Sequence, residues 1–350
     1  MMPRKGHKMS VTIYDVAKHT NISTCWVSWT LRNHPRSLEL RPETRERIRQ
    51  AAQKLGYRPK TSAATIKKGF NPSTVALVLN QEGPISGLQH IIQYLNTLGY
   101  GARVYFDNLL EEAFNDIMDN QIHYVFSTSY WSDRRAQLSD FCSKNGLRAV
   151  FASSGEPLPH PAFQTDNEGM FVEMVHRLYA LGHRKIALCC GPHTHNSTIL
   201  RHAGYRRGLA ECGLSYGDEL TLCEDFSAEH VLSFVRKNPV TAFCCIDGLV
   251  ALKLEHILIR HGVRIPQDIS LIAACGSQQE AEAALVPITF FSAPGFCLVD
   301  DALDYLLERR SHFPFDETNC LVYPSVYHEE ESLAVPRKHR KLELKPDLFR

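Results

Sequence analysis

The chain has 350 residues, 44% of them hydrophobic, which predicts two or three compact units with enough apolar material for a core. It holds no apolar run of about 18 residues, and its N-terminus lacks the apolar segment of a secretion signal, so neither a membrane-spanning nor a secreted protein is expected. The formal net charge is +1, yet residues 1–70 hold 15 Lys or Arg against 4 Asp or Glu, a net of +11. A basic head on an acidic body favours nucleic-acid binding at one end of the chain.

Residues 12–33 indicate two short helices joined by a tight turn. Both helices have an apolar face with i, i+3, i+4 spacing, made of Ile13, Val16, Ala17, Val27, Thr30 and Leu31. Asn21 suits a left-handed turn position, and Ser23 is a suitable N-cap for the second helix. Two such helices packed at a steep angle form a helix-turn-helix, whose second helix presents its outer face to the DNA major groove. The alternative is a basic face that is only solvated.

After the helix-turn-helix, the hydrophobic pattern of the sequence changes at Thr74. Before it, a third helix is expected from Pro42 to Gly56, and residues 61–68 form either a linker or a helix that folds on a partner. After it, helical patterns alternate with continuous apolar runs. The expected strands are 75–79, 102–106, 124–127, 148–152, 186–190, 242–246 and 269–274. This alternation predicts two Rossmann-like lobes of doubly wound parallel sheet, with a ligand at the carboxyl ends of the strands.

A series of short motifs follows the same course along the chain. They are VTIYDVA at 11–17, WVS at 26–28, TR at 44–45, LGYRP at 55–59, TDN at 165–167, LGHRKIA at 181–187, GP at 191–192, RHAGY at 201–205 and GVRIPQDIS at 262–270. In this order they resemble the lactose-repressor/galactose-repressor (LacI/GalR) family of bacterial transcription regulators, over about residues 11–335. The resemblance implies a homodimer in which an effector between two lobes changes the spacing of the DNA-binding heads.

The resemblance also implies the domain organisation. The expected fold class is α/β, with an N-terminal helix-turn-helix domain and a two-lobed body like the periplasmic binding proteins. We assign residues 1–10 to a basic extension, 11–59 to the DNA-binding domain, 60–72 to a hinge helix or linker, 73–336 to an effector-binding and dimerisation domain, and 337–350 to a basic tail. Lobe 1 is expected over about 73–153 and 290–318, and lobe 2 over about 154–289 and 319–336.

The expected DNA contacts depart from the family pattern in the second helix. The residues expected at DNA are Thr12, Tyr14, Ser23, Thr24, Cys25, Trp26, Ser28, Trp29, Arg32, Ala63 and Ile66. Trp26 and Trp29 replace the usual Thr and Arg, and either indole could instead close the small domain. Arginine binds guanine through two hydrogen bonds, whereas an indole favours apolar contact with a thymine methyl group. Ile66 stands where the family has a leucine that enters the minor groove, although it could be an ordinary linker residue.

The expected effector site departs from the family further. Its candidate residues are Arg201, Asp247, Ile246, Cys275 and Asn167. Arg201 occupies the place of a ligand-binding arginine, but Ile246 and Cys275 replace an Asn and an Asp. Losing these polar groups disfavours a plain hexose and favours a non-standard sugar derivative or an anionic metabolite. The alternatives are helix capping by Asp247, as by Asp166, inert packing of Cys275, and an ion pair of Arg201 across an empty cleft.

The cysteine pattern indicates no metal or disulfide site. Eleven cysteines occur as the pairs Cys189-Cys190 and Cys244-Cys245 and seven singles, without a C-x-x-C spacing. Both pairs lie in apolar strand-like runs, so reduced core cysteines are expected. No metal and no cofactor are predicted.

The sequence thus predicts a DNA-binding transcriptional repressor. We expect a homodimer on a palindromic operator in double-stranded DNA, in the bacterial cytoplasm and associated with the nucleoid, with a small-molecule effector and no membrane partner. No catalytic motif is present, so an enzyme is not expected. Two alternatives stay open: a DNA-binding regulator with a degenerate cleft and no effector, and a ligand-binding protein that has lost sequence-specific DNA recognition.

Overall fold

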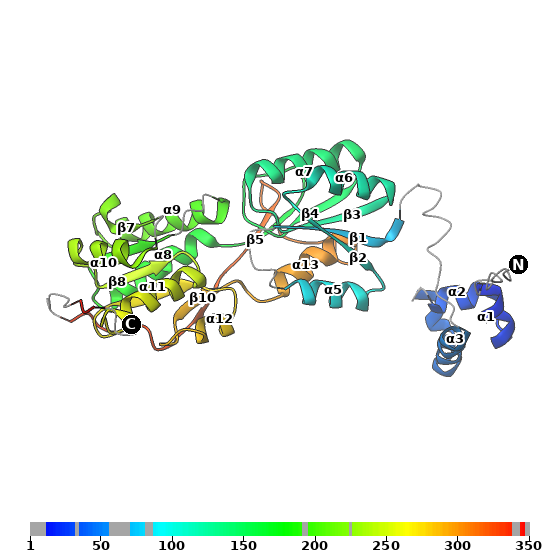
Figure 1. Ribbon diagram of the computed structural model, residues 1–350. Helices are drawn as coiled ribbons and strands as arrows, with labels where there is room; N and C mark the ends of the chain where they lie inside the picture. Colours follow the sequence, from blue (N-terminus) through cyan, green and yellow to red (C-terminus); the bar gives the residue numbers. More distant parts are fainter. Residues whose placement is uncertain are drawn as a thin grey trace, which may run out of the picture. The chain divides into compact units, whose positions relative to one another are not determined.

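The computed structural model describes residues 12–31, 35–55, 71–80, 87–190, 195–223, 226–337 and 344–346. The chain divides into two compact units, 1–71 and 72–350, which we call the head and the body (Figure 1). The extension 1–10, nearly all of the hinge 60–72 and most of the tail 337–350 lie outside the described residues. So do three expected DNA contacts, namely Arg32, Ala63 and Ile66.

The head is a small bundle of helices. It contains α1 (Ile13–Thr20), α2 (Thr24–Leu31), a 3-10 helix η1 (Pro35–Glu39) and α3 (Pro42–Leu55). Thr12 begins α1, since its backbone N and its Oγ1 each donate to Asp15 Oδ2 at 2.7 Å. Asn21 ends α1 with a φ of 52°, the left-handed conformation expected of it. The buried core of the head consists of Val16, Ala17, Val27, Ile48, Ala51 and Ala52. The predicted helix-turn-helix therefore forms, with α3 completing its core.

The body has the predicted alternation of strands and helices. Its strands are β1 (Asn71–Leu79), β2 (Gly101–Phe106), β3 (Ile122–Ser127), β4 (Arg148–Phe151), β5 (Ala162–Thr165), β6 (Ile186–Cys189), β7 (Thr221–Leu222), β8 (Ala242–Cys245), β9 (Ser270–Ala274), β10 (Thr289–Ser292), β11 (Cys320–Tyr323) and β12 (Val326–His328). Its helices are α5 (Leu88–Thr97), α6 (Leu110–Asp119), α7 (Ser132–Asn145), α8 (Asn167–Ala180), α9 (Asn196–Glu211), η2 (Asp218–Leu220), α10 (Ala228–Lys237), α11 (Gly248–Arg260), α12 (Gln278–Glu282) and α13 (Cys297–Leu306).

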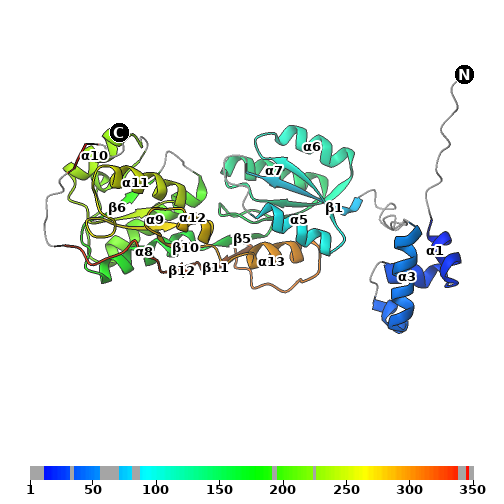
Figure 2. The same ribbon diagram turned by 60° about the horizontal axis from the view of Figure 1, so that its bottom comes forward.

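These strands build two six-stranded sheets, one in each lobe. The orders are β11-β5-β4-β3-β1-β2 and β12-β10-β9-β8-β6-β7. The described pairings are parallel apart from β12 on β10. Every residue of β8 and β9 is buried, because helices cover both faces of a doubly wound sheet. In lobe 1, α5 and α13 lie on one face and α6 and α7 on the other (Figures 1 and 2). The expected fold class is confirmed.

The expected lobe boundaries need correction, because the chain crosses between the sheets after β5, β10 and β11. We expected residues 154–289 and 319–336 in lobe 2, yet β5 and β11 pair with each other in the sheet of lobe 1. Most of β10 was assigned to lobe 1, yet it pairs with β9 in lobe 2. The reason is that β5, β10 and β11 have only four residues each, so pairing with distant segments, and not a local sequence signal, decides which sheet they join. Ala162 N, for example, donates to Asn319 O at 3.0 Å, across most of the body sequence.

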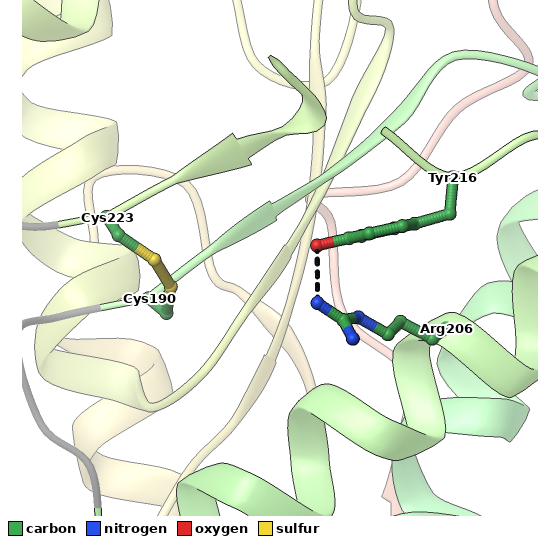
Figure 3. Close-up of a disulfide and its surroundings, with 4 residues drawn as sticks. All are labelled: Cys190, Arg206, Tyr216 and Cys223. Atoms are coloured by element: carbon green, nitrogen blue, oxygen red, sulfur yellow. Dashed lines mark hydrogen bonds between the residues drawn. A yellow bond between two sulfur atoms is a disulfide. The ribbon is translucent and has the colours of Figure 1, made fainter. Parts of the chain in front are cut away.

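The expectation that every cysteine is reduced was wrong. Cys190 and Cys223 form a disulfide with their Cα atoms 4.9 Å apart (Figure 3). Spacing hid this pair because 33 positions separate the two residues. Parallel pairing of β6 with β7 brings them together, since Cys189 stands opposite Leu222 and each cysteine comes one residue later. The other nine cysteines are free, and six of them are buried, as expected of reduced core cysteines.

Two further observations concern membranes and metals. Among the described helices, none combines the length and apolar character needed to cross a lipid bilayer. Across the same part of the chain, no three His, Cys, Asp or Glu side chains are placed to hold a metal ion together.

Candidate DNA-binding face and effector site

The helix α2 presents one face to the core of the head and the other outward. Val27 and Thr30 are buried, whereas Cys25 and the neighbouring Ser23 are exposed. The candidates Thr24, Trp26, Ser28 and Trp29 are partly exposed. The helix therefore offers the residue set expected at DNA to the outside of the head, in the manner of a recognition helix.

The two indoles of α2 pack on each other. Their ring centroids are 5.0 Å apart with an interplanar angle of 89°, an edge-to-face pair. The Arg36 guanidinium lies 5.5 Å from the centre of the Trp29 ring. Because both rings also stay partly exposed, Trp26 and Trp29 pack locally and still present apolar surface beside a positive charge.

Two further candidates flank α2. Thr12 is exposed, and its side chain serves the capping box of α1. Tyr14 has 72% of its surface exposed, which is unusual for an aromatic residue and leaves it available to a partner. On α3, the cations Arg47, Arg49 and Lys54 are exposed. The head thus combines a basic surface with exposed aromatic groups.

In the body, close helix packing positions the first candidate effector residue. Arg201 lies in α9, which packs against α8 through Gly204 and Gly208. A Cβ atom at Gly204 would overlap the carbonyl oxygen of Glu168, so only glycine permits this approach. The contact brings the first turn of α8, with Asn167, beside Arg201.

The guanidinium of Arg201 is held by two neutral oxygen atoms. Its Nε donates to Asn167 Oδ1 at 2.7 Å, and its Nη1 donates to the Ile246 carbonyl oxygen at 2.7 Å. Asn167 is itself fixed, because its Nδ2 donates to Ser154 Oγ at 2.7 Å. Burial lowers the pKa of Arg201, an effect that the charge of Asp247 opposes. The group still keeps its positive charge at neutral pH, since arginine titrates so far above it.

The structure gathers all five effector candidates at this place, although not all through their side chains. Ile246 is 3% exposed and offers its backbone carbonyl. Asp247 caps α11 by accepting from Val250 N at 2.7 Å, as Asp166 caps α8. Cys275 is buried, and burial raises the pKa of its thiol, so it stays neutral. Arg201 is thus the one side chain of the set that combines a full charge with no capping role.

A second cluster, which we call the lobe junction, escaped the sequence reasoning. Ser132 Oγ of lobe 1 donates to Asn196 Oδ1 of lobe 2 at 2.8 Å. The His195 ring lies 4.3 Å from that of Tyr130 and 6.0 Å from that of Trp131. Within the described structure, Asn196 Nδ2 and Trp131 Nε1 are buried donors without a hydrogen-bond partner. Buried donors of this kind suit an acceptor-rich ligand.

Next to the lobe junction lies a buried carboxylate. Asp107 follows β2 and is 1% exposed, and it accepts from Ser129 Oγ at 2.6 Å and from Arg134 Nη1 at 3.0 Å. The Arg134 guanidinium also lies 5.6 Å from the centre of the Trp131 ring. A search for polar residues just after each strand could have found Asp107, because the carboxyl ends of parallel strands meet at one edge.

A hollow of about 410 Å³ lies elsewhere in the body. It runs along α10 and is lined by Ser227, Glu229, His230, Ser233, Phe234, Lys237 and Asn238. None of the five effector candidates lines it. We therefore keep the Arg201 cluster as the candidate site, because it unites a charged group with the ends of several strands.

Comparison with known proteins finds matches to both the head and the body. The family model described as bacterial regulatory proteins, lacI family, matches residues 12–60, and the one described as a periplasmic binding protein-like domain matches residues 175–327. HTH-type transcriptional regulator AglR of Rhizobium meliloti (strain 1021) is 27% identical over 295 residues, 76% of this chain and 78% of that protein. HTH-type transcriptional repressor CytR of Escherichia coli (strain K12) is 25% identical over 323 residues, 88% of this chain and 92% of that protein.

Solved structures agree in fold. The Lac repressor dimer bound to operator and the anti-inducer ONPF has a TM-score of 0.68 at 19% identity, covering 93% of this chain and 99% of that one. The CelR–cellobiose complex has a TM-score of 0.62 at 22% identity, covering 92% and 99%. The head of this chain thus matches the lacI family of bacterial regulatory proteins and the body matches a periplasmic binding protein-like domain, and the relatives named above are HTH-type transcriptional regulators.

Proposed function

We propose that this protein is a transcriptional repressor that binds a palindromic operator as a homodimer through α2. A small molecule held near Arg201 then modulates its affinity for the operator. The observation that carries the proposal is the outward face of α2 on a folded helix-turn-helix, within a segment of net charge +11. The curated relatives named above are a regulator and a repressor of this type.

The direct test is selection of bound sites from a random DNA pool by the full-length protein. A palindromic motif with two half-sites is expected, since protein two-fold symmetry is mirrored in the operator. Recovery of no motif, together with tight binding of a metabolite, would instead support a ligand-binding protein that has lost DNA recognition.

The protein is expected to be a dimer and not a tetramer. One helix-turn-helix contacts only about 4 to 6 base pairs, too few for specificity, so two half-sites are needed. Residues 337–350 also lack the apolar heptads that could join two dimers. Light scattering at micromolar concentration should give about twice the chain mass of 39.7 kDa. A mass four times that of the chain would contradict this prediction.

Trp29 is expected to set which base is preferred at one position of each half-site. The partly exposed indole favours a thymine methyl group, whereas the Trp29→Arg variant gains two hydrogen bonds to guanine. Site selection should therefore yield T with the natural protein and G with the variant at the same position. We expect a discrimination of about 1 to 3 kcal/mol between the two bases.

A matched control separates this base contact from charge alone. Gln50 is exposed on α3, so Gln50→Arg adds the same charge to the head away from α2. It should raise affinity for all DNA and leave the selected motif as it was. If Trp29→Arg also leaves the motif unaltered, the Trp29 ring acts only through packing against Trp26.

A second candidate function is a DNA-binding regulator without an effector. Two observations favour it: Ile246 and Cys275 offer no charged side chain, and the lobes already contact each other through Ser132 and Asn196. A thermal-shift screen against metabolites separates the two functions, because a ligand of the folded state raises the unfolding temperature. A response to no compound would favour this second function.

A further inference from the structure

The disulfide stands at the base of the segment that carries the lobe junction. Cys190 directly follows β6, and α9 begins at Asn196, six positions later. His195 and Asn196 make the described contacts of this segment with Tyr130 and Ser132 of lobe 1. Only five residues separate Cys190 from Asn196, so the disulfide and the lobe junction lie close together along the chain.

The partner strand is weakly held without the disulfide. β7 has only two residues and lies at the edge of its sheet, where it pairs with β6 at two positions. One more backbone bond follows, from Cys190 N to Leu222 O at 2.9 Å. On the other side, Arg206 of α9 donates to the Tyr216 hydroxyl at 3.0 Å, which ties the chain before β7 to α9 (Figure 3). The Cys190–Cys223 bond is the covalent link between the end of this edge strand and the end of β6.

The surrounding cysteines argue against a general oxidised state. All eleven cysteines lie among the described residues, and nine of them are free. A protein that acts on DNA works where thiols are kept reduced, and disulfides in such proteins are usually transient and redox-sensing. Cys223 is half-buried while Cys190 is 2% exposed, so Cys223 is the sulfur that a small reagent reaches first.

We infer that Cys190 and Cys223 form a reversible thiol–disulfide switch that changes the lobe junction and, through it, operator affinity. The last step rests on the proposed repressor function. A hydroperoxide serves as the oxidant: the Cys223 thiolate attacks its terminal oxygen, which gives a sulfenic acid and releases water or an alcohol. The Cys190 thiolate then attacks the Cys223 sulfur and displaces hydroxide, which leaves as water. Two thiols lose two electrons and two protons, and a dithiol reductant reverses the change.

Counting thiols tests the chemistry. The full-length protein should show nine thiols after brief treatment with hydrogen peroxide and eleven after dithiothreitol, when titrated unfolded; the nine match the free cysteines of the structure. Peptide mapping without reductant should join the peptides of Cys190 and Cys223. The Cys223→Ser variant lacks the sulfur that the peroxide attacks, so it should show ten thiols in both states. An unchanged count in the natural protein, or a different pair of joined peptides, would overturn the switch.

Tryptophan fluorescence tests the structural effect. The chain has three tryptophans, and Trp131 is the one at the lobe junction. In the Trp26→Phe, Trp29→Phe double variant, emission therefore reports this site alone. Emission should differ between the oxidised and reduced protein and should stop responding when Cys190→Ser is added. Identical spectra in the two states would show that the disulfide does not act on the junction.

Operator binding tests the regulation. With an operator found by site selection, the two redox states should differ in affinity by about fivefold or more, the lower end of typical coupling between sites. Cys223→Ser should abolish the difference. Cys297→Ser and Cys25→Ser each remove an exposed thiol elsewhere in the chain. For each of these two variants, the oxidised and reduced forms should still differ in operator affinity.

The outcomes separate the two proposals. Equal affinity in both states would overturn the regulatory claim. Absence of operator binding in both states would contradict the repressor function instead, and the Trp131 spectra would then decide the switch by themselves.

Discussion

Operator affinity is expected to fall by about a thousandfold when monovalent salt rises from about 50 to 200 mM. The head carries a net charge of +11 in residues 1–70, against −10 for the remainder of the chain. A dimer brings two such heads to DNA, and each phosphate contact releases condensed counterions, with a loss of about 0.9 in the log–log slope. Fluorescence anisotropy of a labelled operator across a salt series measures this slope.

Charge-removing variants show which unit carries the effect. Arg36 lies beside the Trp29 ring, so Arg36→Gln should reduce the slope by about one for each phosphate group that the variant no longer neutralises. Lys144→Gln is the matched control, because Lys144 is exposed on α7 of the body and pairs with Asp140. It should leave the slope unchanged. A binding curve that stays flat over this salt range would contradict a phosphate-binding head.

Arg201→Ala is expected to weaken effector binding by about 10- to 150-fold, since a hydrogen bond to a charged group contributes about 1.5 to 3 kcal/mol. Among the described residues, Arg201 forms no ion pair, and its partners are the neutral oxygens of Asn167 and Ile246. Its fixed charge is thus available to an anionic ligand. Beside it lie the neutral Cys275 and the capping Asp247, so a plain hexose would keep unpaired hydroxyl groups.

Calorimetry with a panel of sugars, sugar phosphates and organic acids measures this prediction. The natural protein is expected to bind an anionic or partly apolar compound. Arg201→Ala should weaken this binding, whereas the control variant should not. Arg206→Ala is the control on the same helix, because Arg206 is exposed and bonds to Tyr216 instead. The unfolding temperatures of both variants show whether the fold persists. Micromolar binding of a plain hexose that Arg201→Ala does not affect would contradict our account of the site.

The sequence by itself determined the local elements of this protein and their order. The capping pair Thr12 and Asp15, the left-handed Asn21 and the apolar spacing around Val16 and Val27 are local signals, because each acts within one or two helical turns. Continuous apolar runs likewise predicted the buried strands β8 and β9. Motifs spaced along the chain indicated the family resemblance, and with it the choice of Arg201 as a candidate effector residue.

Tertiary structure decided what depends on pairing between distant segments. β5, β10 and β11 are four residues long, so their sequence pattern is too short to show which of the two sheets they join. Backbone hydrogen bonds between distant residues, such as that of Ala162 to Asn319, determine the sheet. The Cys190–Cys223 bond follows from the register of β6 with β7. Asp107 meets Arg134 because parallel strands end at one edge. These contacts join residues far apart in the chain, and only the folded body brings them within reach.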